Sequence, residues 1–308
     1  MVWKFFSASV RGTSHERNDT PKQDYCLTEV YKKNDLEYII AAVADGAGSA
    51  SRSDASSKFI CKYFIRNMKN WISEHEMYDL DRDTVASWFT GFKRIMERAV
   101  KFKMTDAVRE FSTTLLLSVL SDDDKSIFIQ IGDGAISVGS KTRFECVFWP
   151  QNGEFMNTTL FATDRNVEDT FMFKKMDRKI SRVAMHTDGI EIISLNFAEQ
   201  RPFVPFFNPF FSALEKMQQD GYSDGLSKQL GAFLASDKVN QKTDDDKTVV
   251  FISRCVGDFN DVEYPLDIYK FQLPVTNWGN PFTMENILKK QRLDIEYNAR
   301  QIQDISLN

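Results

Sequence analysis

Three Asp-Gly pairs stand where an apolar run of the sequence ends. Asp45 follows YIIAAVA, Asp133 follows IFIQIG, and Asp188 follows RVAMHT. The end of a strand would hold each acid on a rigid scaffold, and the glycine after it lets other groups approach the backbone. Asp-Gly is also an ordinary turn sequence. The two other Asp-Gly pairs, at 220–221 and 224–225, lie between helical patterns, and we interpret them as turns.

The chemistry that such acids support depends on whether they meet. Several carboxylates at one edge of a fold repel one another unless a divalent cation neutralises them. Ligand sets made only of oxygen suit Mg²⁺ or Mn²⁺. Two such ions, roughly 3.5–4 Å apart, lower the pKa of a shared water and hold a phosphoryl group for in-line attack. Spacing alone leaves both interpretations open, scattered turns or a metal site.

Composition narrows the functions that the chain can carry. It has 308 residues, 42% of them hydrophobic and 27% charged, as is typical of a globular protein with a full core. Its net charge of −5 argues against nucleic acid or an anionic membrane surface as the main partner. No apolar run is long enough to span a bilayer, and the start, MVWKFFSASVRG, lacks the apolar region of a signal peptide. We therefore expect a cytoplasmic protein.

The residue types that bind metals point to carboxylates. The four cysteines lie far apart without a C-x-x-C pair, which argues against a zinc site or a disulfide framework. The chain has only three histidines, which argues against a His-rich zinc enzyme. Aspartates must therefore carry any metal chemistry.

Hydrophobic periodicity predicts the elements that would position these acids. Apolar runs predict strands at 3–10, 25–31, 37–44, 114–120, 126–131, 143–148, 158–162, 171–174, 182–186 and 248–253. Apolar residues at helical spacing predict helices near 59–71, 85–100, 209–219 and 226–234. This order lacks the strand–helix alternation of a parallel sheet. We predict an α+β fold, a four-layer α-β-β-α sandwich of two antiparallel sheets flanked by helices, with a C-terminal extension.

The composition changes after residue 255, so we predict a domain over 1–255 and an irregular, then helical, extension over 256–308. Residues 284–305 have a helical pattern in which Leu288, Ile295 and Ile302 recur every seven residues. This helix could contact a partner or a second subunit, or pack on its own domain.

Two acidic turns have nearly the same local sequence. SDDDKSIFI at 121–129 and TDDDKTVVFI at 243–252 both lead into a strand. Local physical chemistry does not distinguish a metal ligand from a solvated hairpin tip in these two segments.

The order of motifs along the chain adds a family resemblance. QDYC, VADGAGS, FSTTLL, IQIGDGAI, HTDGI and DDKTVVFI follow one another between about residues 7 and 253. This series resembles the metal-dependent protein phosphatases, the PPM or type 2C serine/threonine family, whose patterns are roughly ED, VxDGxGG, GST, GDS, SDG and DNxTxxxV. The segment RGTSH…PKQD resembles most a bacterial subgroup of that family.

The resemblance implies a set of metal ligands. Asp45 would bridge two Mn²⁺ or Mg²⁺ ions, and the Gly46 carbonyl would bind one of them. Asp188 and Asp245 would complete the shell of one ion, and Asp24 would hold the other directly or through water.

Three further roles follow from the same resemblance. Asp133, together with Asp188, would hold a weaker third metal. Ser112 and Thr113 match the Ser-Thr pair that supports the site structurally. The acidic run 122–124 would remain a solvated turn.

Three positions depart from the family pattern. The phosphate-binding Arg usual after the first motif's glycine is His15 here, so His15, Arg11 or Arg17 would supply that positive charge. The family's Glu before the first acid is Gln23, and the His often found after Asp-Gly as a proton donor is Ala47. His15 could also act as a proton donor. We expect His186 to be a packed strand residue.

The resemblance implies a protein serine/threonine phosphatase that uses direct attack of a metal-bridging hydroxide on phosphoserine or phosphothreonine. Its partners would be a phosphorylated protein and a cognate Ser/Thr kinase. The departures at Gln23, Ala47 and the missing Arg leave a rival, a catalytically impaired pseudophosphatase that acts as a regulatory binding module. A two-metal hydrolase of nucleotides is a second rival, disfavoured because the chain has no P-loop.

Overall fold

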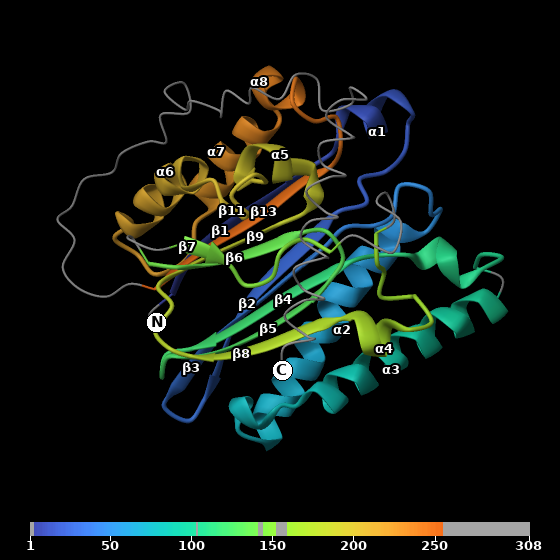
Figure 1. Ribbon diagram of the computed structural model, residues 1–308, viewed down its shortest axis with the longest axis horizontal. Helices are drawn as coiled ribbons and strands as arrows, with labels where there is room; N and C mark the ends of the chain where they lie inside the picture. The colour runs from blue at the N-terminus through green and yellow to red at the C-terminus, as the bar shows by residue number, and fades with distance from the viewer. Residues whose placement is uncertain (1–2, 103, 141–143, 152–158, 255–308) are drawn as a thin grey trace.

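Two β-sheets lie face to face, and helices cover the outer face of each sheet (Figure 1). The computed structural model describes residues 3–102, 104–140, 144–151 and 159–254. The predicted four-layer α-β-β-α sandwich is therefore confirmed. The predictions for 256–308, including the helix at 284–305, lie outside the described residues.

The first sheet has the strand order β12-β1-β13-β9-β6-β7. Its strands are β1 (Trp3–Val10), β6 (Ala135–Gly139), β7 (Phe144–Cys146), β9 (Arg182–His186), β12 (Gly221–Tyr222) and β13 (Lys247–Arg254). Neighbouring strands are antiparallel except β1 and β12, which pair in parallel. That one pair departs from the prediction of two purely antiparallel sheets.

The second sheet is antiparallel throughout and has the order β2-β3-β4-β5-β8. Its strands are β2 (Tyr25–Lys33), β3 (Leu36–Ala44), β4 (Leu115–Ser121), β5 (Lys125–Ile131) and β8 (Met172–Asp177). A separate two-stranded ribbon joins β10 (Leu195–Asn196) to β11 (Arg201–Pro202).

Two long helices, α2 (Ser53–Glu74) and α3 (Arg82–Lys101), cover the second sheet, and α5 (Glu191–Ser194), α6 (Val204–Glu215) and α7 (Asp224–Leu234) cover the first (Figure 1). The short helices are α1 (Thr13–Arg17), α4 (Val167–Thr170) and α8 (Asp237–Asn240). Three 3₁₀ helices are η1 (Met77–Asp79), η2 (Val108–Phe111) and η3 (Asp188–Ile190). Among the described residues, no helix is long and apolar enough to cross a membrane.

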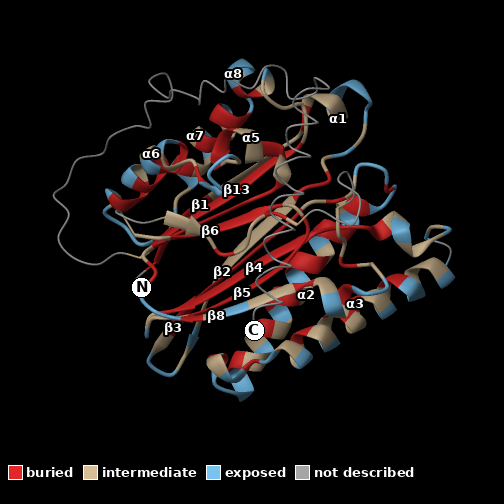
Figure 2. Ribbon diagram, viewed as in Figure 1, coloured by how far each residue is buried: buried red, intermediate tan, exposed pale blue. Residues whose placement is uncertain are grey.

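The inner strands of each sheet are largely buried on both faces, which explains why many of them are continuous apolar runs, whereas the edge strands β2 and β8 are mostly half-buried (Figure 2). In β13, Val249 and Phe251 pack under the helices of the first sheet, whereas Val250 and Ile252 pack between the two sheets. This alternation follows from the two-residue period of a strand. The same period determines which face of the sheet each residue at the end of a strand points to.

Three sequence predictions need correction. Strand β6 was not predicted because it follows Gly134 without a long apolar run. Residues 159–162, predicted as part of a strand, are irregular and contribute to the pocket described below. Helix α6 begins at Val204 and includes Pro209, although proline disfavours a helix interior. Burial of four phenylalanines on α6 outweighs that cost: Phe206, Phe207, Phe210 and Phe211.

We predict that Phe89→Ala destabilises the fold by about 3–5 kcal/mol, because it empties a fully buried position. The Phe89 ring is 0% exposed and lies 4.7 Å from the ring centroid of Phe64 and 5.0 Å from that of Phe171. The matched control is Phe102→Ala at the end of the same helix. Phe102 is 81% exposed, so its loss should change the free energy of unfolding by less than about 0.5 kcal/mol. Urea unfolding followed by circular dichroism measures both, and equal effects would contradict the described packing.

Candidate metal centre and phosphate pocket

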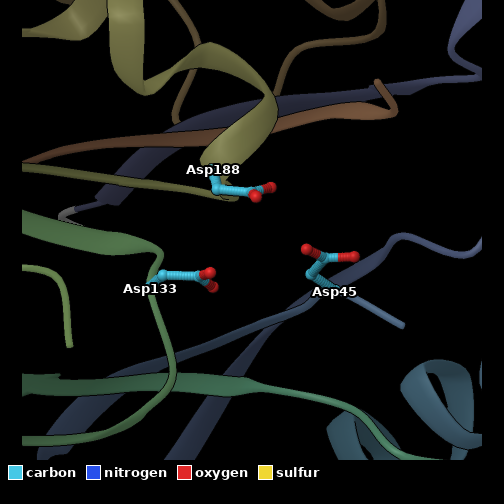
Figure 3. Close-up of side chains that lie close together, drawn as sticks. All are labelled: Asp45, Asp133 and Asp188. Carbon is cyan, nitrogen blue, oxygen red and sulfur yellow. The ribbon is translucent and has the colours of Figure 1, made fainter. Parts of the chain in front are cut away.

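The three strand-end aspartates meet at one edge of the sandwich. Asp45 follows β3 of the second sheet, Asp133 lies between β5 and β6, and Asp188 opens η3 after β9 of the first sheet. One carboxylate oxygen from each lies within 4.8 Å of the chosen oxygens of the other two (Figure 3). Both sheets therefore contribute to one acidic centre.

Asp45 and Asp188 have pKa values raised well above the ordinary value of an aspartate. Burial is the largest cause for both. For Asp45 the next cause is repulsion by Asp188, and for Asp188 it is repulsion by Asp133. These side chains disfavour simultaneous ionisation unless positive charge arrives between them.

Asp24 lies directly before β2 and extends the acidic centre. It is buried, and the Thr187 hydroxyl donates to its Oδ2 at 2.8 Å. Burial, followed by repulsion from Asp246, raises the pKa of Asp24 to about 7. Its Coulombic contribution to Asp45 places Asp24 in the same electrostatic group.

Asp245 precedes β13 and is half-exposed. Burial is the largest cause that raises its pKa, and repulsion by Asp246 contributes. Gly189 lies against this segment so closely that a Cβ there would come within 1.8 Å of the Asp246 carbonyl oxygen. That approach explains the glycine after Asp188, which holds η3 against the start of β13.

Backbone contacts fix the segment around Asp45. The Thr113 hydroxyl donates to the Asp45 carbonyl at 2.8 Å, and the Asp45 N–H donates to the Thr114 hydroxyl at 2.9 Å. The Ala47 N–H donates to the Ser112 carbonyl at 3.0 Å. These contacts give Ser112 and Thr113 the kind of supporting position that the sequence predicted. A Cβ on Gly46 would come within 2.7 Å of Ser53, so this position also requires glycine.

The acids line an open pocket of about 490 Å³. Its charged or titratable lining residues are His15, Asp45, Asp133, Asp188, Asp244 and Asp245. The backbone at Gly46, Ala47 and Gly48 forms part of the wall, and the small side chains there leave space. The pocket is therefore wide enough for small ions and a phosphoryl group, and strongly acidic.

The donor set fits divalent cations. The acidic centre contains buried oxygens without a hydrogen-bond partner among the described residues, and these include Gln23 Oε1, Asp24 Oδ1 and Asp188 Oδ1. Buried acceptors without a donor cost free energy, and a cation would satisfy them. Carboxylate and amide oxygens are the ligands that Mg²⁺ and Mn²⁺ prefer.

Of the three predicted phosphate-binding residues, only His15 lines the pocket. Its Nδ1 lies 3.0 Å from Asp246 Oδ1, outside the alignment of a hydrogen bond, and its Nε2 lies 3.9 Å from Asp245 Oδ1. Arg11 donates to the His15 carbonyl at 3.0 Å. Arg17 pairs with Asp244 at 2.6 Å on the surface.

The sequence analysis missed two residues. Thr187, which binds Asp24, stands directly before the Asp-Gly motif at 188–189. Asp246, 2% exposed, occupies the place of the family's Asn after the ligand Asp, which was the available signal. His186 is confirmed as a packed residue, because it is fully buried and burial lowers its pKa to about 4.

We predict that Asp188→Asn stabilises the metal-free protein and removes most of its response to metal. Because the folded pKa of Asp188 is raised, the folded state binds its proton more tightly than the unfolded state, so stability falls as pH rises above the unfolded pKa. Near pH 8 in EDTA, removing the charge should raise Tm by about 2–6 °C, equivalent to about 1–2 kcal/mol.

Thermal unfolding at pH 8, in EDTA and in excess Mn²⁺, measures this prediction. The matched control is Asp124→Asn at the tip of the β4–β5 hairpin, whose metal-induced rise in Tm should equal that of the wild type. A lower Tm of Asp188→Asn in EDTA would show that repulsion does not dominate this site.

Comparisons with known proteins agree with this geometry. The sequence model of the family described as Protein phosphatase 2C matches residues 11–235. Serine/threonine-protein phosphatase 3 of Escherichia coli is 33% identical over 250 residues, which cover 81% of this chain and 97% of that protein. The fold and the large share of the chain that is covered both agree with membership of this family.

Two solved structures show the same fold at low identity. The serine/threonine phosphatase PstP/Ppp of Mycobacterium tuberculosis is 11% identical with a TM-score of 0.54, and the match covers 83% of this chain and 100% of that chain. PppA of Pseudomonas aeruginosa is 12% identical with a TM-score of 0.52, and the match covers 82% and 98%. With its acidic centre at the edge of this sandwich, the chain belongs to the protein phosphatase 2C family of serine/threonine phosphatases.

Proposed function

We propose that this phosphatase hydrolyses phosphoserine and phosphothreonine esters of proteins in the pocket at the edge of the sandwich. The observation that carries the proposal is the convergence of Asp45, Asp133 and Asp188 within 4.8 Å at a pocket of about 490 Å³. A phosphorylated protein is the substrate, and the cognate partner is the Ser/Thr kinase that installs the phosphate.

The residues present would hold two Mn²⁺ or Mg²⁺ ions. Asp45 feels the charges of the other four predicted metal-binding aspartates and would contact both ions, with the Gly46 carbonyl beside it. Asp188 and Asp245 would hold one ion, because each contributes to the electrostatics of the same centre. Asp24 would hold the other ion, directly or through water, with its unpaired Oδ1.

A weaker third ion would lie between Asp133 and Asp188, because Asp133 is the carboxylate that contributes most to the raised pKa of Asp188. The Thr159 hydroxyl donates to Asp133 Oδ2 at 2.6 Å and orients that carboxylate. When bound, the ions supply an activated water for direct attack on phosphorus and positive charge for the phosphoryl oxygens.

The protein's own groups orient the phosphoryl group and the leaving oxygen. Among the described residues that line the pocket, His15 is the one whose side chain can carry a positive charge, so it can bind phosphate or give a proton to the leaving oxygen. Ala47 leaves the position after Asp-Gly without a proton donor. His15 therefore replaces either the family's Arg as a phosphate ligand or its His as a proton donor.

We predict that Asp45→Asn and Asp245→Asn lower kcat/KM for a phosphopeptide at least about 100-fold, since cation binding supplies several kcal/mol of charge stabilisation. Asp123→Asn is the matched control for Asp245→Asn, because it changes the same position of the twin acidic turn without touching the pocket. Initial rates in a Mn²⁺ titration measure the effect.

Unchanged turnover in Asp45→Asn would disprove the proposed mechanism. A wild-type protein that binds Mn²⁺ and phosphopeptide without turnover would instead support the pseudophosphatase. Faster hydrolysis of a nucleotide than of the phosphopeptide would favour a different two-metal hydrolase.

We predict that His15→Ala lowers kcat/KM about 10–100-fold, the cost of a lost hydrogen bond to a charged group. His75→Ala is the control, because His75 stacks on Trp71 at the far end of α2, with ring centroids 4.0 Å apart. Arg17→Ala tests the alternative source of positive charge. A larger loss in Arg17→Ala than in His15→Ala would move phosphate recognition to Arg17.

A further inference from the structure

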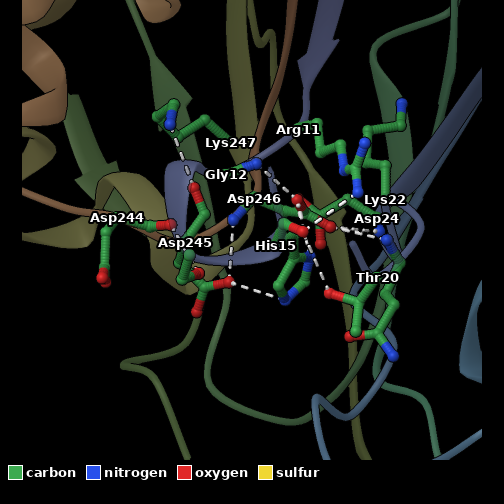
Figure 4. A network of polar contacts seen from close by, with 12 residues as sticks. Arg11, Gly12, His15, Thr20, Lys22, Asp24, Asp244, Asp245, Asp246 and Lys247 are labelled. Atoms are coloured by element: carbon green, nitrogen blue, oxygen red, sulfur yellow. Dashed lines mark hydrogen bonds and ion pairs between the residues drawn. The ribbon is translucent and has the colours of Figure 1, made fainter. Parts of the chain in front are cut away.

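One buried carboxylate connects the metal side of the pocket to the phosphate side. Asp246 Oδ1 accepts the Gly12 N–H at 2.7 Å and lies 3.0 Å from His15 Nδ1 (Figure 4). Asp246 Oδ2 accepts the Gln23 N–H at 2.5 Å and the Asp24 N–H at 3.3 Å. The two oxygens therefore hold two separate segments of the chain against the start of β13.

These contacts require a carboxylate rather than an amide. Among the described residues, the groups that contact the Asp246 oxygens are backbone N–H groups and an imidazole nitrogen, and a carboxylate accepts on both oxygens. Asparagine has one accepting oxygen, and its NH₂ group would face a backbone N–H whichever way the amide is turned. A buried donor that faces another donor loses its hydrogen bond.

The His15 segment has little freedom to adjust. A Cβ on Gly12 would lie 2.3 Å from the Asp245 carbonyl carbon, so the α1 segment already packs against the 244–245 backbone. The Ser14 N–H and hydroxyl both donate to the Asp244 carbonyl, at 2.8 and 2.7 Å. The backbone that carries His15 is therefore fixed to the turn that contains Asp246.

We propose that Asp246 is a positioning residue that sets the His15 imidazole against the phosphate position and the Asp24 carboxylate against the metal position. The proposal deepens the proposed function and rests on it for the role of His15. Asp246 itself does not line the pocket, so it acts through these neighbours.

The chain supplies a matched control in its other acidic turn. Asp124 has the same place in SDDDK that Asp246 has in TDDDK. It pairs with Arg254 at the opposite end of β13, away from the pocket. Asp124→Asn makes the same chemical change in nearly the same local sequence.

The test measures the affinity of the Mg²⁺-loaded full chain for inorganic phosphate by calorimetry. The proteins are the wild type, Asp246→Asn, His15→Ala, the double variant and Asp124→Asn. We expect Asp246→Asn to weaken phosphate binding at least about tenfold, as lost support of a ligand does. In the His15→Ala background the same change should cost less than about threefold, because Asp246 acts through His15. Asp124→Asn should bind phosphate like the wild type.

A second arm measures Mn²⁺ affinity without substrate. Asp246→Asn should weaken it about tenfold through the Asp24 segment, whereas Asp124→Asn should leave it unchanged. Wild-type affinities for both phosphate and Mn²⁺ in Asp246→Asn would overturn the proposal. The proposal would also be overturned if the loss of phosphate affinity in the double variant equalled the product of the losses in Asp246→Asn and His15→Ala.

Two controls keep the outcomes separate. If the wild type shows no metal-dependent phosphopeptide hydrolysis, the proposed function fails, and the Mn²⁺ arm still tests the link between Asp246 and Asp24. If Asp246→Asn does not fold, nitrogen NMR of the Mg²⁺-loaded wild type replaces the binding measurements. The signals of the His15 ring are identified by their loss in His15→Ala. A proton on His15 Nδ1 is expected, because the facing carboxylate oxygen only accepts, and an unprotonated Nδ1 would overturn the proposal.

Discussion

Repulsion between aspartates that both sheets deliver to one edge is the constraint on which the rest of the structure depends. Asp45 comes from one sheet and Asp188 from the other. The charge of Asp188 raises the pKa of Asp45, and the charge of Asp133 raises the pKa of Asp188. A sandwich that only had to be stable would not bring these charges together, because like charges at close range are unfavourable. Favourable packing elsewhere in the fold therefore offsets the repulsion at a site that is complete only when cations are bound.

The packing that opposes this repulsion lies directly behind the site. Each sheet packs against one apolar layer between the sheets and another beneath its helices. Strand ends therefore cannot separate without exposing core residues. Hydroxyls complete the restraint close to the acids. Thr113 holds the backbone of Asp45, and Thr187 holds the carboxylate of Asp24. The neutral donors on these threonines orient the acids without adding charge to the centre.

Sequence patterns predicted the layers of the fold because buried strands and amphipathic helices have distinct periods. They also predicted which strand ends carry acids. They did not show that Asp45, Asp133 and Asp188 meet, because convergence depends on the order of strands in two sheets, which no local pattern encodes. Strand β6 and the early start of α6 were missed for a related reason: tertiary burial outweighed weak local signals.

The two acidic turns show where local sequence stops determining role. In the β4–β5 hairpin, Asp124 adopts a left-handed backbone with φ +72 and pairs with Arg254 near solvent. In the equivalent turn, Asp246 is buried and meets the backbone N–H groups of Gly12 and Gln23. Strand β13 runs across the sandwich between the two turns. Its last residue, Arg254, lies at the solvated β4–β5 hairpin, whereas its first residue follows Asp246 at the pocket. The donors brought by β1 and β2, rather than the TDDDK segment itself, turn an ordinary acidic turn into part of the site.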